Sequence, residues 1–271
     1  MKKPALHVEV NFTPFQIDEM QLKDRTVVII DVLRSCTTIS MALQNGAKEI
    51  IPAKNIETAM RISTGLDSAV TLRGGERNGK MIEGFNLGNS PHEYTEAAVN
   101  GKTIILLTTN GTKVMAGSRL ARRAFLASFV NLSAVVLSLR EIGDSFTIIC
   151  SGKESRFSLE DAVCAGRIVN ALGAHKDVQL ALDDGATAAS GLDKAFGKNI
   201  PKMLHQCEHG QYLASIGFER DLDLCGKIDS IPVVPSLAGG VFKKWKPLAI
   251  TLAVPAPAVK STASKSSSNK K

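Results

Sequence analysis

The sequence has few aromatic residues and no closely spaced cysteine pairs. Phe, Trp and Tyr make up 5% of its 271 residues, with a single Trp, so basic and aromatic side chains do not alternate as they do on nucleic-acid-binding surfaces. The five cysteines are scattered and odd in number, which argues against a disulfide scaffold and favours a reducing compartment. No apolar run approaches the roughly 20 residues of a membrane-spanning helix.

An apolar core of the signal-peptide type is also missing, because Glu9 interrupts the first apolar segment. We therefore expect a cytoplasmic protein with no membrane partner. The net charge of +7 is unevenly placed, since four lysines and no acidic residue fall in residues 248–271. That segment is rich in Pro, Ala, Ser and Lys, which predicts a disordered tail. The remainder is only mildly basic, so we expect no nucleic-acid partner.

Apolar runs alternate with helical patterns along residues 1–247. The longest runs are typical of strands buried on both faces, and a polar loop and a helix follow each of them. These runs are residues 26–30, 103–107 and 146–150. Shorter strands are expected at residues 6–12, 48–52, 69–72, 124–127 and 231–234, with a Gly-rich loop over 73–90 and a helix over 91–98. The pattern predicts an α/β fold with a mixed, largely parallel sheet or sheets flanked by helices. One domain, or two subdomains split near residues 120–130, would satisfy it.

Ligands of open α/β sheets bind beyond the carboxyl ends of the strands, so the loops after the strands are the candidate site. The first of these loops carries Asp31, Arg34, Ser35 and Thr37. A carboxylate at a strand end can hold a divalent cation, and an arginine fork suits a phosphate or carboxylate. The helix start at residue 35 favours an anion. A helix cap with a surface ion pair explains the same residues equally well.

The second loop contains two carboxylates, Glu76 and Glu83, within a Gly-rich segment. Together they could coordinate Mg²⁺, which prefers oxygen ligands. Arg77 could clamp an anion, and Asn89 with Ser90 precedes another helix start at Pro91. A flexible surface loop is the alternative interpretation.

Two further loops complete the candidate set. One is a tight strand-to-helix turn made of Thr109, Asn110, Gly111 and Thr112. Its hydroxyl and N–H groups suit phosphate, and Gly111 allows close backbone approach. The other contains Ser158, Glu160 and Asp161, in which Ser158 and Asp161 have the spacing of a helix capping box.

Several familiar sites are absent. The sequence contains no GxxxxGK[ST], GxGxxG, HExxH or GxSxG motif. His205, Cys207 and His209 look like a metal cluster, but only the two histidines share a helix face and no further ligand is nearby, which argues against zinc. Cys36 and Cys150 fall near the candidate site, where buried filler is the commoner role of a free cysteine.

These loops resemble consecutive motifs of the 2-phosphosulfolactate phosphatases of coenzyme M biosynthesis. The segments, in chain order, are VVIIDVLRSCTTI (residues 27–39), GGERNGKMIEGFNLGNSPHEYT (74–95), TIILLTTNGT (103–112) and RFSLEDAVCAG (156–166). Residues 209–235 resemble the C-terminal part of the same family. The resemblance spans residues 6–246 and excludes the tail.

The resemblance implies a Mg²⁺-dependent hydrolase that converts (2R)-2-phospho-3-sulfolactate to 3-sulfolactate and phosphate. In our hypothesis Asp31 and Glu76, with Glu83 or Asp161 as a further candidate, hold Mg²⁺. Arg34 binds phosphoryl oxygens, and Asp31 or Glu160 orients the attacking water. Arg77 and the turn at residues 109–112 bind the carboxylate or sulfonate. Phosphoryl transfer depends mostly on positioning and charge stabilisation, so this set is sufficient.

Three alternatives remain open at this point. Related chains can act on other small 2-phospho acids. An aspartyl-phosphate enzyme would use Asp31 as nucleophile, but such enzymes need a second Asp where this chain has Leu33. A non-catalytic anion-binding protein would have little use for the carboxylates. The sequence does not decide whether an exposed sheet edge pairs two copies into a homodimer.

Overall fold

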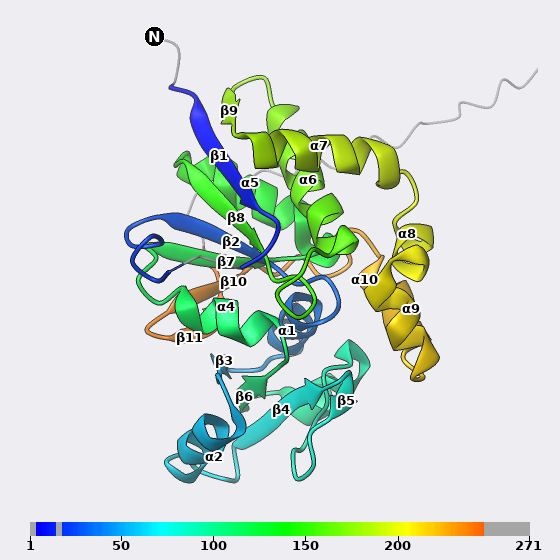
Figure 1. Cartoon of the computed structure of the whole chain (residues 1–271). Helices are drawn as coiled ribbons and strands as arrows, with labels where there is room; N and C mark the ends of the chain where they lie inside the picture. Colours follow the sequence, from blue (N-terminus) through cyan, green and yellow to red (C-terminus); the bar gives the residue numbers. More distant parts are fainter. Residues whose placement is uncertain (1–3, 15–17, 247–271) are drawn as a thin grey trace, which may run out of the picture.

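The computed structural model describes residues 4–14 and 18–246, so the tail predicted at 248–271 lies outside the described residues. The strands are β1 (Leu6–Asn11), β2 (Thr26–Ile30), β3 (Glu49–Pro52), β4 (Thr71–Arg77), β5 (Lys80–Met81), β6 (Thr103–Leu107), β7 (Arg123–Ala127), β8 (Phe146–Cys150), β9 (Leu180–Leu182), β10 (Pro235–Ala238) and β11 (Val241–Lys244). The helices are α1 (Ser35–Gln44), α2 (Ile56–Thr64), α3 (Glu96–Val99), α4 (Gly111–Gly117), α5 (Leu132–Ile142), α6 (Leu159–Gly173), α7 (Asp184–Phe196), α8 (Ile200–Gln206), α9 (Glu208–Ser215) and α10 (Glu219–Cys225), with 3₁₀ turns η1 (Pro91–Glu93) and η2 (Phe129–Asn131) (Figure 1).

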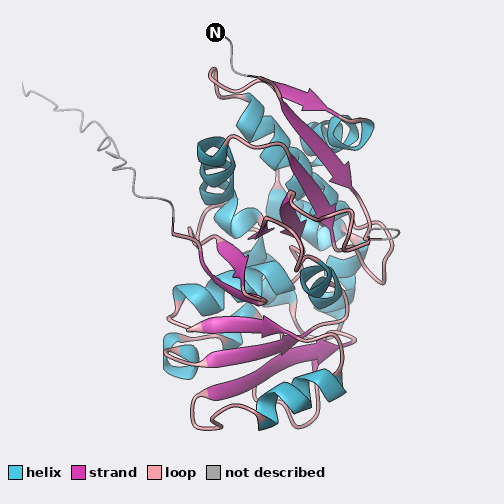
Figure 2. Ribbon diagram, turned by 90° about the vertical axis from the view of Figure 1, so that its left-hand side faces the viewer, coloured by secondary structure: helices cyan, strands magenta, loops and turns pink. Residues whose placement is uncertain are grey.

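The strands form one mixed sheet made of two parallel blocks. Its order is β5-β4-β6-β3-β11-β10-β7-β2-β8-β1-β9. The block β4-β6-β3 and the block β7-β2-β8-β1-β9 are joined by the antiparallel hairpin β10–β11. Figure 2 shows the strands of the first block lying side by side with helices around them. The predicted α/β fold is confirmed, and the strands on either side of residues 120–130 share this sheet.

The core has one layer on each face of the sheet, and strand β2 contributes side chains to both layers. All five of its residues are buried. Val28 and Ile30 join a cluster with residues of α5 and α6, whereas Val27 and Ile29 join a second cluster with residues of α1 and α4. Successive side chains of a strand point to opposite faces, so an unbroken apolar run buries both.

The structure corrects the predicted loop over residues 73–90, because β4 continues through Arg77 instead of ending at residue 72. Two glycines permit this. A Cβ atom on Gly75 would lie 2.0 Å from the carbonyl oxygen of Leu107, and one on Gly74 would lie 2.3 Å from the Tyr94 hydroxyl. Glycines that suggest a loop in the sequence here allow β4 to approach its neighbours closely.

The C-terminal part also differs from the prediction. The described residues 231–234 form no strand, and the hairpin β10–β11 follows them, turning at Gly239 and Gly240 with φ angles of 61° and 82°. Strand β9 is not among the strands expected from the sequence. The predicted helix 91–98 is split into η1 and α3, because Thr95 accepts a hydrogen bond from the Ala98 N–H and starts a new helix. In residues 4–14 and 18–246, no helix is long and apolar enough to cross a bilayer.

Candidate active site

One cavity collects most of the candidate loops. Its volume is about 160 Å³, and it lies between the loops that follow β2, β6 and β8, the β4–β5 hairpin and helix α9. It is lined by Asp31, Leu33, Arg34, Ser35, Glu76, Asn78, Gly79, Asn89, Thr109, Asn110, Lys153, Glu154, His209, Tyr212 and Leu213. Residues far apart in the sequence therefore meet at one site, as expected for loops at strand ends.

Asp31 directly follows strand β2, and it is 4% exposed. Its Oδ1 accepts a hydrogen bond from the Ser35 backbone N–H at 3.0 Å. Gly111 makes room for it, because a Cβ atom there would lie 2.4 Å from Asp31 Oδ2. The pKa of Asp31 is raised to about 6, mainly by burial and in smaller part by Glu76, while the hydrogen bonds from Ser35 oppose the rise. Asp31 is therefore a carboxylate that can accept a proton near neutral pH.

Glu76 connects the β4–β5 hairpin to the end of β6. Its Oε1 accepts from the Thr109 backbone N–H at 2.6 Å. Its Oε2 accepts from the Gly79 N–H at 2.8 Å and from the Thr109 hydroxyl at 3.1 Å. A carboxylate offers about four acceptor positions, so Glu76 is held in place and keeps capacity for one more partner.

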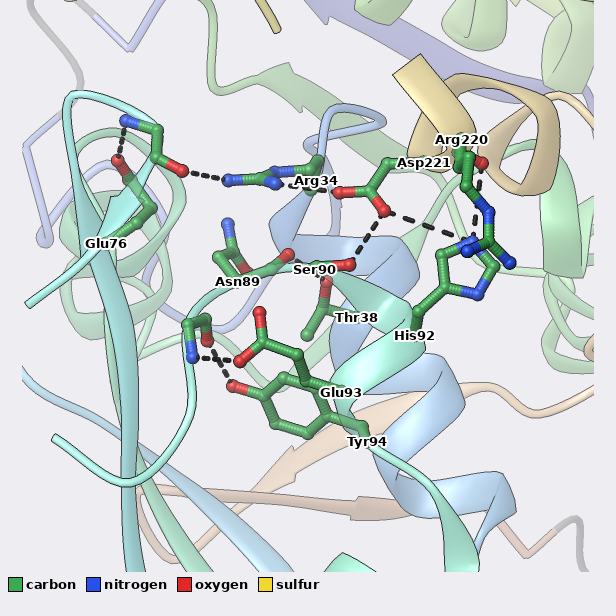
Figure 3. A network of polar contacts seen from close by, with 12 residues as sticks. Arg34, Thr38, Glu76, Asn89, Ser90, His92, Glu93, Tyr94, Arg220 and Asp221 are labelled. Carbon is green, nitrogen blue, oxygen red and sulfur yellow. Dashed lines mark hydrogen bonds and ion pairs between the residues drawn. The ribbon is translucent and has the colours of Figure 1, made fainter. Parts of the chain in front are cut away.

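Arg34 is buried and held by two elements at once. Its Nη1 donates to Asp221 Oδ2 at 2.7 Å, and its Nη2 donates to the Gly79 carbonyl oxygen at 2.7 Å. The guanidinium carbon lies 4.3 Å from the centroid of the Phe218 ring. Asp221 in turn accepts from the Ser90 hydroxyl at 2.7 Å (Figure 3). Sequence reasoning predicted Arg34 and missed Asp221, which fixes it.

Ser35, Asn89, Thr109 and Asn110, which were predicted to bind substrate, line the cavity. Arg34 lines it as well, whereas three other predicted binding residues, Ser90, Thr37 and Thr112, are buried and are not among the described residues of the lining. Ser90 donates to Asp221, Thr37 donates to the Val32 carbonyl oxygen, and Thr112 donates to the Thr108 carbonyl oxygen. Gly111 backs Asp31. Arg77 is half-buried and is not among the described residues that line the cavity.

The structure does not bring Glu83, Glu160 or Asp161 to the cavity lining. Glu83 is exposed. Glu160 and Asp161 are buried, and burial raises the pKa of both. Asp161 accepts from the Val32 N–H at 2.9 Å through Oδ1 and from the Gly152 N–H at 3.0 Å through Oδ2. Asp161 thus ties the loop after β2 to the loop after β8.

The cavity offers a small set of oxygen ligands for a cation. Among the described residues, no group of three or more His, Cys, Asp or Glu side chains could hold a metal ion. The cavity does contain the carboxylates of Asp31 and Glu76, and the buried Oδ1 of Asn89 has no hydrogen-bond partner within residues 4–14 and 18–246. Mg²⁺ is commonly bound through one or two carboxylates, waters and substrate phosphate oxygens. These residues fit that pattern.

Sequence reasoning missed the side of the cavity formed by helix α9. His209 and Tyr212 come from α9, and Lys153 lies with its Nζ 5.3 Å from the Tyr212 ring centroid. Burial lowers the pKa of His209 to about 4, with Lys153 and Arg34 acting in the same direction. The segment 209–212 and the position of Lys153 after a buried strand were the available signals. Burial also raises the pKa of the thiols of all five cysteines, which disfavours a nucleophilic thiolate.

Comparison with known proteins supplies the family. The model of the 2-phosphosulpholactate phosphatase family matches residues 11–240. The chain belongs to the 2-phosphosulfolactate phosphatase family. A probable 2-phosphosulfolactate phosphatase of Thermotoga maritima is 43% identical over 80% of this chain and 91% of the relative. One of Caldanaerobacter subterraneus is 37% identical over 84% and 93%, and one of Clostridium acetobutylicum is 34% identical over 87% and 99%.

Membership in the 2-phosphosulfolactate phosphatase family confirms the resemblance found in the sequence and makes the protein a phosphoric monoester hydrolase by class. The matched range contains every residue that lines the cavity, from Asp31 to Leu213.

Proposed function

We propose that the protein is a Mg²⁺-dependent cytoplasmic phosphatase that hydrolyses (2R)-2-phospho-3-sulfolactate to 3-sulfolactate and phosphate. The observation that carries the proposal is the meeting of Asp31, Glu76 and Arg34 in one small cavity of a chain from this family. Two buried carboxylates beside an arginine suit a phosphate that arrives with a divalent cation.

In this proposal the carboxylates of Asp31 and Glu76 and the amide oxygen of Asn89 would hold Mg²⁺. Bound Mg²⁺ would neutralise charge on the phosphoryl oxygens. Arg34 uses two of its five N–H groups on Asp221 and Gly79. The remaining N–H groups of Arg34 would bind the phosphoryl oxygens.

Asp31 also orients the attacking water in this proposal, because Glu160 does not line the cavity. The water oxygen bonds to phosphorus while the bond from phosphorus to the C2 oxygen breaks. Asp31 accepts the proton that the water loses, and the released C2 oxygen takes up a proton to become the hydroxyl of 3-sulfolactate.

The test is phosphate release from three substrates, measured with Mg²⁺ and with EDTA. The substrates are 2-phosphosulfolactate, 2-phospholactate and 2-phosphoglycerate. We expect the highest kcat/KM with 2-phosphosulfolactate, loss of activity with EDTA and recovery when Mg²⁺ is restored. A higher kcat/KM with another member of the panel would assign the enzyme to that 2-phospho acid. Tight binding without phosphate release would instead indicate an anion-binding protein.

A further inference from the structure

We propose that Lys153, together with His209, binds the sulfonate end of the substrate and sets the preference for a sulfonated 2-phospho acid. This inference rests on the proposed function and adds to it the residues that distinguish the substrate from its relatives. It starts from the unequal distribution of charge in the cavity.

The buried carboxylates of the cavity, Asp31 and Glu76, do not suit the same part of the substrate as Lys153. The third carboxylate of the lining, Glu154, is 60% exposed and pairs with Arg156 at 3.3 Å. Asp31 and Glu76 repel an anion unless a cation lies between them, so they suit the phosphate end with its metal. The carboxylate and sulfonate of the substrate need positive groups elsewhere. Among the described residues that line the cavity, the side chains that supply a positive charge are Arg34 and Lys153.

Arg34 and Lys153 differ in how strongly they are already paired. The ion pair of Arg34 with Asp221 is buried, with side chains 1% and 3% exposed. Lys153 Nζ is 2.8 Å from Glu208 Oε1, and the Glu208 side chain is 76% exposed. An ion pair with so exposed a partner contributes little to stability. Lys153 can therefore exchange Glu208 for a substrate anion at small cost, whereas Arg34 cannot leave Asp221 so easily.

The backbone around Lys153 holds it at a defined place. Lys153 and Arg156 exchange two backbone hydrogen bonds of 3.1 and 2.9 Å across a tight turn. Glu154 and Ser155, the two residues inside the turn, have φ angles of 52° and 62°. Non-glycine residues rarely adopt such angles, and they persist where the surroundings impose them, often at functional sites. The Asp161 carboxylate also joins this loop to the loop that carries Asp31 and Arg34.

His209 contributes a second polar atom, Nδ1, that can bind the sulfonate. Its Nδ1 is buried and has no hydrogen-bond partner among the described residues, although His209 lines the cavity. A buried polar atom without a partner is unfavourable. In the tautomer with hydrogen on Nδ1, a neutral His209 would donate to a sulfonate oxygen without placing a second positive charge beside Lys153.

The experiment compares Lys153→Met with wild type on two substrates. 2-Phospholactate lacks the sulfonate and is otherwise the same acid. We expect kcat/KM of Lys153→Met for 2-phosphosulfolactate to fall about 10- to 100-fold, the range of a lost hydrogen bond to a charged group. With 2-phospholactate the change should stay within about threefold. Lys153→Arg, which keeps the charge, should retain most of the preference.

Glu208→Gln is the matched control, because it breaks the same ion pair from the other side and leaves Lys153 free. We expect it to keep or raise kcat/KM for 2-phosphosulfolactate. Equal losses on both substrates in Lys153→Met would overturn the proposal, as would a loss in Glu208→Gln that matches it. Thermal unfolding of each variant separates these outcomes from misfolding.

The proposed function and this inference fail in different ways. Absence of phosphate release by the wild type rejects the function, whereas an unchanged substrate preference in Lys153→Met rejects the sulfonate site. Calorimetric titration with 3-sulfolactate and with lactate gives a second measurement that needs no turnover. We expect wild type to bind 3-sulfolactate more tightly than lactate and Lys153→Met to bind the two alike. Equal binding of both acids by the wild type would also reject the sulfonate site.

Discussion

Two sides of the cavity differ in charge and in how they are held. The strand-end wall, formed by Asp31, Glu76 and Thr109, presents acceptor oxygens fixed by backbone hydrogen bonds. The α9 wall, formed by Lys153, His209 and Tyr212, presents donors held by an exposed ion pair and one hydrogen bond to a hairpin.

This difference suggests that one wall serves catalysis and the other serves substrate recognition. A rigid acidic wall suits the chemistry that is common to all 2-phospho acids, because phosphoryl transfer depends on precise positioning. A more loosely held basic wall suits recognition of the chemical group that differs from one 2-phospho acid to another. Substitutions in the strand-end wall should therefore abolish activity, whereas substitutions in the α9 wall should change substrate preference or KM.

The largest effect is expected for Asp31→Asn, which removes the proton acceptor of the strand-end wall. We expect kcat/KM to fall at least about 1000-fold, within the usual range for loss of a general base. Phosphate release with saturating Mg²⁺ measures this. Full Mg²⁺-dependent activity in Asp31→Asn would exclude the role given to Asp31.

The same variant should be more stable than wild type in the absence of Mg²⁺. The folded pKa of Asp31 is about 6 and its ordinary value is 3.8, so the folded state keeps a proton that the unfolded chain loses. Stability from this group therefore falls as pH rises from about 4 to about 6, by roughly 2 to 3 kcal/mol. Thermal unfolding should give Asp31→Asn a higher Tm than wild type at pH 7, and no higher Tm at pH 4. Added Mg²⁺ should raise the Tm of wild type alone.

A smaller effect is expected for Asp221→Asn, which leaves the buried Arg34 guanidinium without its counter-charge. Breaking a buried ion pair from one side costs about 3 to 5 kcal/mol. We expect a lower Tm and a fall in kcat/KM of about 30-fold, because Arg34 would lose its fixed orientation. Asp223→Asn is the matched control on the same helix, since its side chain is 65% exposed. If Asp221→Asn behaved like Asp223→Asn, Asp221 would not position Arg34.

The strand-end wall was largely predictable from the sequence, and the physical reason is local. Strands β2 and β6 are unbroken apolar runs buried on both faces, so their ends and the residues that follow could be located. Asp31 and Thr109 follow from that rule. Glu76 was chosen from the same region, although it lies in a strand rather than in the predicted loop.

The remaining features depend on contacts between distant segments. Asp221 meets Arg34 across 187 residues, and no local pattern selects one acidic residue of α10 over another. The hairpin β10–β11 is placed by pairing with β7 and β3, which a four-residue apolar run does not specify. Glu83 follows the β4–β5 hairpin, is exposed and is not among the described residues that line the cavity.

The smallest effect is expected for Tyr212→Phe in the α9 wall. The Tyr212 hydroxyl donates to the Asn78 carbonyl oxygen at 2.9 Å in an exposed setting, and water can replace that donor. The ring that lies near Lys153 is kept. We expect a loss of stability below about 1 kcal/mol and a KM for 2-phosphosulfolactate within about threefold of wild type. Steady-state kinetics of Tyr212→Phe and Lys153→Met, measured in parallel with wild type, checks this expectation. An equal fall in kcat/KM for 2-phosphosulfolactate in Tyr212→Phe and Lys153→Met would mean that the position of α9, and not the charge of Lys153, governs recognition. The two walls would then differ in rigidity alone.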